Sequence, residues 1–92
     1  MGDTTRVEVE FTITNELGLH FRAAAMIVRT VADFESAMEI RAGEAVADAK
    51  SVLDLMTLAA ARGTRVHVTA EGKDAKAAVE ALGALIQRNF AE

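Results

Sequence analysis

The sequence predicts an α+β fold in which a four-stranded, mainly antiparallel sheet carries three helices on one face. Four segments alternate between apolar and polar residues, which is the period of a strand with one buried face. Three further segments carry apolar residues at helical spacing, and the order along the chain is β-α-β-β-α-β-α. Because each strand keeps one polar face, the helices are expected to cover the other, leaving an open-faced sandwich.

The first strand and the first helix are expected in the opening third of the chain. Residues 6–14 alternate and place four apolar side chains on one face, namely Val7, Val9, Phe11 and Ile13. Residues 15–18 are expected to turn. The spacing becomes helical over residues 21–33, with an inward stripe of Ala24, Ile27, Val31 and Phe34. This helix is expected to begin near His20.

A hairpin and a second helix are expected in the middle of the chain. Residues 37–41 and 45–48 flank Gly43 and are predicted to pair as the two arms of the hairpin. Ser51 follows, with Asp54 three residues later, in a pattern that resembles a capping box. The helix that it opens is expected to end at Arg62-Gly63, because glycine suits the left-handed residue that often ends a helix.

A last strand and helix complete the fold. Residues 64–70 alternate, and His67 falls on their outward face, where we interpret it as a solvated surface residue. Asp74 is expected to cap the final helix. The inward stripe of that helix is Ala75, Ala78, Val79, Leu82, Leu85 and Ile86. Since no linker or repeat divides the chain, residues 1–92 are predicted to form a single domain.

Composition excludes several classes of function. The 92 residues include no cysteine, tryptophan or tyrosine, so disulfides, thiolate metal sites and aromatic platforms for nucleic acid are not expected. The net charge of −4 argues against binding to a phosphate backbone. No apolar run approaches the ~20 residues that span a bilayer, and no secretory signal is visible. We expect a monomeric cytoplasmic protein without a cofactor.

His20 is the candidate reactive residue. A helix N-terminus presents unpaired N–H groups and a positive dipole end, which together favour an anion. A neutral imidazole there could accept a phosphoryl group, and Arg22 could stabilise that group by charge-assisted hydrogen bonds. The plainer alternative is a loop histidine bonded to its neighbours. A metal site is disfavoured, since no second ligand stands at metal spacing from His20.

Ser51 is the second candidate, and it also has two interpretations. A helix N-cap stabilises a protein by ~1 kcal/mol, which is sufficient reason for a serine there. The alternative is a phosphorylation site, since a phosphate at a helix start is favourable and Lys50 could help a kinase to dock. The residues alone favour the cap.

The two segments together resemble the HPr-type phosphocarriers of the bacterial phosphotransferase system. The active-site motif of that family stands here as Gly18-Leu19-His20-Phe21-Arg22-Ala23-Ala24, and its second motif as Lys50-Ser51 followed by an apolar helix. The resemblance implies that His20 accepts a phosphoryl group from enzyme I and donates it to an enzyme IIA-type protein. It implies that Arg22 stabilises the transferred group. Ser51 would match the serine that an HPr kinase/phosphorylase modifies in some bacteria.

Two departures from the family pattern bear on partner choice. Phe21 replaces a small residue, and Ala23 replaces the usual proline at the helix start. A docking patch is expected to consist of Leu19, Phe21, Leu53 and Met56. A regulatory binding module on the same fold, acting by docking or through Ser51, is the main alternative to a carrier, and a purely structural domain is a weaker one. The resemblance fits a carbohydrate-uptake branch and a nitrogen-linked branch equally.

Overall fold

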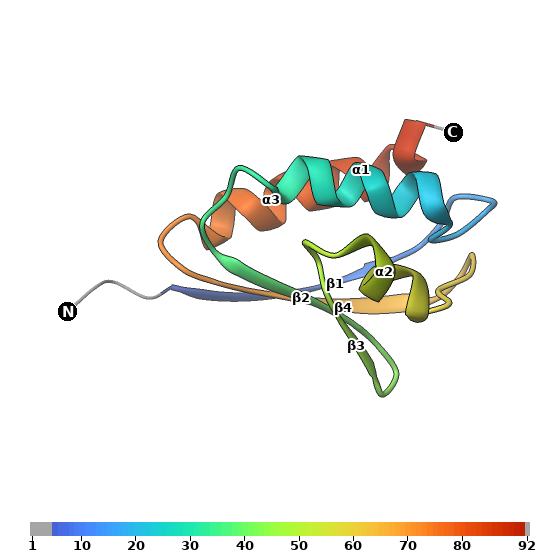
Figure 1. Ribbon diagram of the computed structural model, residues 1–92, viewed down its shortest axis with the longest axis horizontal. Helices are drawn as coiled ribbons and strands as arrows, with labels where there is room; N and C mark the ends of the chain where they lie inside the picture. The colour runs from blue at the N-terminus through green and yellow to red at the C-terminus, as the bar shows by residue number, and fades with distance from the viewer. Residues whose placement is uncertain (1–4, 92) are drawn as a thin grey trace.

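The computed structural model describes residues 5–91, which fold into a sheet with helices on one side (Figure 1). The element order matches the sequence prediction, with one short 3-10 helix added at the end. The strands are β1 (Arg6–Thr12), β2 (Ala37–Ala42), β3 (Ala45–Asp48) and β4 (Arg65–Glu71). The helices are α1 (Phe21–Val31), α2 (Val52–Thr57), α3 (Ala75–Gln87) and the 3-10 helix η1 (Asn89–Ala91).

The four strands form one antiparallel sheet in the order β1-β4-β2-β3. The last strand in the chain, β4, therefore lies between β1 and β2, and Val68 pairs with Val9 on one side and with Ile40 on the other. Helices α1 and α3 lie over the same face of the sheet and contact each other, and α1 also contacts α2 (Figure 1). The predicted fold class is confirmed.

The core lies between the sheet and its helices. The inward residues of β4 are buried, as are those of β2 and the predicted stripe of α3. Gly83 lets α3 approach β1 closely, because a Cβ there would lie 2.8 Å from the ring of Phe11. The outward positions of the strands remain largely open, which is the pattern that the period of two predicted.

Helix α2 ends earlier than the sequence prediction. It stops at Thr57, and the residue in the left-handed conformation is Ala59, at φ 51°, rather than Gly63. The turn tightens there, since the amide of Ala59 donates to the carbonyl of Met56, 3.3 Å away. Gly63 also has a positive φ, but it belongs to the turn that leads into β4. The expected end at Arg62-Gly63 was wrong because the chain turns at Ala59. The carbonyl of Ala60 then accepts the amide of Leu19 in the loop before α1.

Asp74 does not cap α3 as predicted. It stands at the N-cap position, but its side chain makes no capping bond to the helix. Its carboxylate instead accepts the backbone N–H groups of Glu35 and Ser36, at 2.8 and 2.9 Å, and the hydroxyl of Ser36. These bonds hold the pKa of Asp74 below its ordinary value, with the Ser36 hydroxyl as the largest cause. Asp74 therefore ties the start of α3 to the connection between α1 and β2.

The C-terminal segment was not predicted. Residues 89–91 all adopt positive φ, and within η1 the side chain of Phe90 is fully buried. The carboxamide oxygen of Asn89 accepts the hydroxyl of Thr14, at 2.6 Å. This end of the chain therefore lies beside the loop that leads to His20.

Candidate functional site

Helix α1 begins next to His20, as the sequence predicted, and His20 is its N-cap. Its backbone is extended, at φ −82° and ψ −179°, and its carbonyl accepts the amide of Ala24 at 2.9 Å. Its ring nitrogen Nδ1 accepts the backbone N–H of Arg22 at 3.2 Å. The imidazole therefore caps the helix as a serine or aspartate side chain usually does. Because Nδ1 is an acceptor, the neutral ring carries its proton on Nε2.

The electrostatic setting of His20 suits a negatively charged group. The first turn of α1 contains no acidic residue, so no carboxylate of the helix offsets the positive end of its dipole. The imidazole is only half-buried. A phosphoryl group on Nδ1 would face the start of the helix, where backbone N–H groups favour an anion.

The guanidinium of Arg22 contacts the C-terminal segment and the next turn of its own helix. Its Nη1 atom is 3.4 Å from the carbonyl oxygen of Phe90 and 3.5 Å from the sulfur of Met26. The distance to the Phe90 oxygen is long for a hydrogen bond, a thioether sulfur is a weak acceptor, and the side chain is exposed, so the guanidinium can move at little cost. A phosphoryl group would displace these two partners of the guanidinium, because an anion accepts stronger hydrogen bonds than a carbonyl or a thioether.

The loop before His20 is fixed against the loop that follows α2. Gly18 has φ 68°, and a Cβ on it would lie 2.6 Å from the carbonyl oxygen of Ala60. That same oxygen accepts the amide of Leu19 at 2.8 Å. Gly18 is therefore required both for its conformation and for this close approach. This approach holds the loop before His20 against the connection that follows α2, and helices α1 and α2 are themselves in contact.

Ser51 caps α2 as predicted, but the capping box is incomplete. Its Oγ accepts the amide of Asp54 at 3.2 Å, whereas the carboxylate of Asp54 accepts the amide of Asp48 at the same distance. The amide of Ser51 itself donates to the carbonyl of Asp48, 3.0 Å away. The side chain of Lys50 extends to the connection between α1 and β2, where its Nζ donates to the carbonyl of Phe34 at 2.7 Å.

The predicted docking residues are only partly at the surface. Phe21 and Met56 are 64% and 42% exposed, and Leu53 is 79% exposed. Leu19 is 6% exposed and packs into the core, so its inclusion in the docking patch was wrong. Leu17, which the sequence analysis missed, is 68% exposed in the turn before Gly18. The available signal was one large apolar residue in an otherwise polar turn, directly before a glycine with a positive φ.

His67 differs from His20 in its surroundings. It lies on the outward face of β4, as predicted, but its Nε2 atom is 2.9 Å from a carboxylate oxygen of Glu8 on β1. It is therefore paired and not simply solvated. The hydrogen bond from His67 is the largest of the causes that lower the pKa of Glu8, followed by one from Arg6.

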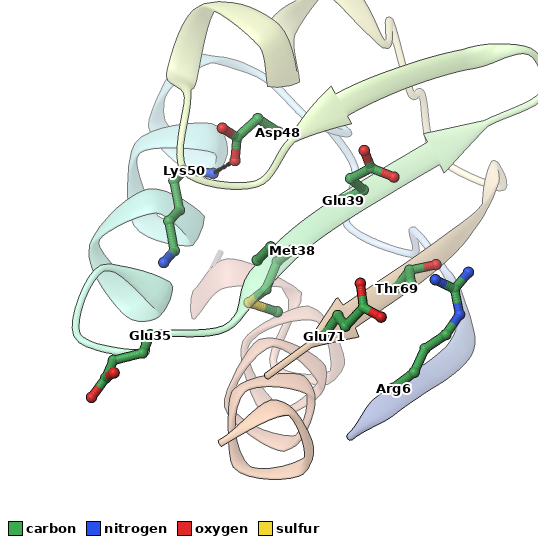
Figure 2. Close-up of a pocket in the computed structure, with 9 residues that line it drawn as sticks. Arg6, Glu35, Met38, Glu39, Asp48, Lys50, Thr69 and Glu71 are labelled. Carbon is green, nitrogen blue, oxygen red and sulfur yellow. Dashed lines mark hydrogen bonds between the residues drawn. The ribbon is translucent and has the colours of Figure 1, made fainter. Parts of the chain in front are cut away.

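A pocket of about 520 Å³ lies on the open face of the sheet (Figure 2). Its lining carries charges of both signs, including Arg6 and Lys50 and the acids Glu39 and Glu71. None of the predicted site residues lines it, so it is separate from the His20 site. In the described part of the chain, no three His, Cys, Asp or Glu side chains gather as a metal site would require. Among residues 5–91, no helix is long and apolar enough to cross a membrane.

Comparison with known proteins gives one consistent family. A family model described as the PTS HPr component phosphorylation site matches residues 7–88. The phosphocarrier protein HPr of Xylella fastidiosa is 40% identical over 86 residues, which cover 94% of this chain and 97% of that protein. The phosphocarrier protein NPr of Shewanella violacea is 39% identical over 88 residues, covering 96% of this chain and 97% of that protein.

The solved structures agree with the sequence comparisons. A crystal structure of HPr from Thermoanaerobacter tengcongensis matches with a TM-score of 0.89 at 37% identity, covering 94% of this chain and 97% of that one. The family match, the relatives and this structure all span nearly the whole of the present chain. The chain therefore belongs to the HPr family of phosphocarrier proteins of the phosphotransferase system.

Proposed function

We propose that this protein relays a phosphoryl group through Nδ1 of His20, from phosphorylated enzyme I to an enzyme IIA-type protein in the cytoplasm. The observation that carries the proposal is the orientation of the ring. Nδ1 points at the amide of Arg22 in the first turn of α1, so its lone pair lies where an anion is best accommodated. On this account the protein is a carrier and a substrate of its partners, without a turnover of its own.

The transfer needs a small rearrangement at the helix start. The Nδ1 lone pair forms the new bond to phosphorus while the donor's bond to phosphorus breaks and its electron pair stays with the donor. The ring keeps its proton on Nε2. The amide of Arg22 gives up Nδ1 and becomes a donor to a phosphoryl oxygen. The guanidinium of Arg22 leaves the carbonyl of Phe90 for the same group.

Phosphate labelling tests the carrier function. Incubation with enzyme I and phosphoenolpyruvate should label the wild-type protein with an acid-labile, base-stable phosphate, and His20→Ala should take up none. Addition of an enzyme IIA-type protein should then remove the label. Equal labelling of both proteins would refute the assignment of His20. A stable label that no enzyme IIA removes would favour a regulatory module over a carrier.

Arg22→Ala tests the stabilising role of the guanidinium. We expect transfer from enzyme I to slow by roughly 100-fold, the size typical for loss of one charge-stabilising donor. Stability should change by less than ~0.5 kcal/mol, because the side chain is exposed. Rapid-quench measurements of labelling, with urea unfolding as the stability control, distinguish the two effects. An unchanged transfer rate would remove Arg22 from the mechanism.

We also propose Ser51 as a regulatory phosphorylation site. Phosphorylation of Oγ would alter its bond to the amide of Asp54 and would place a dianion close to the carboxylate of the same residue. Because α2 lies against α1, this charge would act on the docking of partners at His20. Incubation with an HPr kinase/phosphorylase and ATP should label the wild type but not Ser51→Ala. Labelling of Ser51→Ala to the same extent would exclude the site.

A further inference from the structure

Asn15 is an uncommon kind of residue in this fold. It is 1% exposed, and within the described residues 5–91 it shares full burial of a polar side chain only with Ser36. The burial of Ser36 is explained by its bonds to Asp74. Asn15 lies in the turn before His20, five residues from the ring. A buried amide costs free energy unless its hydrogen bonds are made, so its bonds indicate its role.

The amide of Asn15 holds one peptide group. Its Nδ2 donates to the carbonyl oxygen of Gly18 at 2.8 Å. The N–H of that same peptide group belongs to Leu19 and donates to the carbonyl oxygen of Ala60, also at 2.8 Å. The peptide between residues 18 and 19 is therefore held at its oxygen by Asn15 and at its nitrogen by Ala60. Such a plane cannot rotate without losing a buried hydrogen bond.

This peptide group in turn orients His20. The carbonyl of Gly18 also accepts the backbone N–H of His20, at 3.0 Å. The direction of that carbonyl therefore sets the direction in which the backbone of His20 leaves the turn. The extended backbone of His20 then places Nδ1 against the amide of Arg22. Asn15 is thus connected to the reacting nitrogen by a short series of fixed hydrogen bonds.

We propose that Asn15 is a positioning residue that fixes the orientation of the His20 imidazole for phosphoryl transfer. The proposal rests on the proposed function of His20. Asn15 supplies a second donor to the Gly18 carbonyl, which also accepts the N–H of His20 and belongs to a buried residue. Misplacement of a reacting group by about 1 Å can cost a factor of ~100 in rate, so a loosened ring should slow the transfer.

Two substitutions separate the hydrogen bond from the packing. Asn15→Ala removes the amide, whereas Asn15→Asp keeps its shape and replaces the donor with an acceptor. We expect both variants to lower the maximal transfer rate from enzyme I about 10- to 100-fold. The KM for enzyme I should change far less, because no docking residue is altered. The ring ¹⁵N shifts of unphosphorylated His20 should move from a single Nε2–H tautomer towards a mixture, while those of His67 should stay constant.

Val79→Ala is the matched control for lost stability. Val79 is 4% exposed on α3, and its truncation weakens the core without touching the turn at residues 15–18. This control should lower the melting temperature but keep the wild-type transfer rate and ring shifts. If Asn15→Ala keeps both the wild-type rate and the wild-type His20 shifts, the positioning role is refuted. If the wild type itself takes no label, the proposed relay fails, and the ring shifts still decide whether Asn15 orients His20.

Discussion

His20 occupies an N-cap position that serine or aspartate usually fills. Its bond to the amide of Arg22 is a neutral one of 3.2 Å, and such bonds contribute only about 0.5–1.5 kcal/mol net. The imidazole can therefore give up this bond for a phosphoryl group at little cost to the helix. The charge-assisted bonds that replace it are roughly twice as strong. In the proposed relay, His20 therefore acts both as the cap of α1 and as the phosphoryl acceptor.

Phe21 is the exposed residue closest in sequence to the reacting nitrogen. We expect Phe21→Ala to raise the KM for enzyme I several-fold, since an exposed aromatic beside a docking site is a common contributor to binding. Stability should stay within about 0.5 kcal/mol of wild type, because the ring is 64% exposed. Steady-state phosphorylation at varied enzyme I concentration gives the KM.

Val46 provides a control for that experiment. It is 53% exposed on β3 and lies on the hairpin rather than on α1 or α2, which carry the residues of the proposed docking patch. Val46→Ala should leave the KM unchanged. If Phe21→Ala and Val46→Ala behave alike, Phe21 is not part of the docking surface.

The connection after α2 contains a local strain that can be relieved. Ala59 adopts φ 51°, a left-handed conformation that costs an L-residue roughly 1–2 kcal/mol. Ala59→Gly should therefore stabilise the protein by about 0.5–1 kcal/mol, after the greater freedom of glycine in the unfolded chain is deducted. Urea unfolding measures the change. Ala61→Gly, two residues on and absent from the positive-φ residues, should destabilise instead. A loss of stability in Ala59→Gly would contradict the left-handed assignment.

Asp74 makes the junction between α1, β2 and α3 sensitive to acid. Its folded pKa lies below the ordinary value of 3.8, so its bonds stabilise the fold above that pH. This contribution is lost as the pH falls through the lowered pKa. Asp74→Asn should therefore melt at a lower temperature than wild type at pH 7, and the gap should narrow below about pH 4. Melting temperatures across pH 2–7 test the prediction.

Asp33→Asn is the appropriate comparison for Asp74→Asn. It removes an exposed carboxylate from the same connection without touching Ser36. Its melting curve should follow the wild type at every pH. A gap between wild type and Asp74→Asn that stays constant from pH 7 to pH 2 would show that the carboxylate charge does not contribute.

At the scale of the whole molecule, local sequence patterns predicted the buried residues of those elements that have one buried face. Alternation predicted the inward residues of β2 and β4, and helical spacing predicted those of α3, because periodicity reports burial directly. The strand order β1-β4-β2-β3 did not follow, because it depends on contacts between distant segments. The cap at Ser51 and the helix start near His20 were found because a helix start has a local signature.

Most of the features that sequence reasoning missed depend on contacts between distant segments. Asp74 had the residue type of a cap, yet its carboxylate bonds a loop 38 residues away. Leu19 and Leu17 are both leucines in one turn, and only the packing of that turn buries the first and exposes the second. Phe90 is buried through a run of left-handed non-glycine residues, for which no sequence pattern exists. The buried bond from Asn15 to Gly18 likewise has no periodic signal.

The central claim is that Nδ1 of His20 is the phosphoryl acceptor, and ¹⁵N–³¹P correlated NMR of the phosphorylated protein tests it most directly. The protein is labelled with ¹⁵N-histidine and phosphorylated by enzyme I and phosphoenolpyruvate. The account predicts one phosphorus signal coupled to Nδ1 of His20, with both ring nitrogens of His67 unchanged. A phosphorus signal coupled to Nε2 of His20, or to either nitrogen of His67, would contradict it.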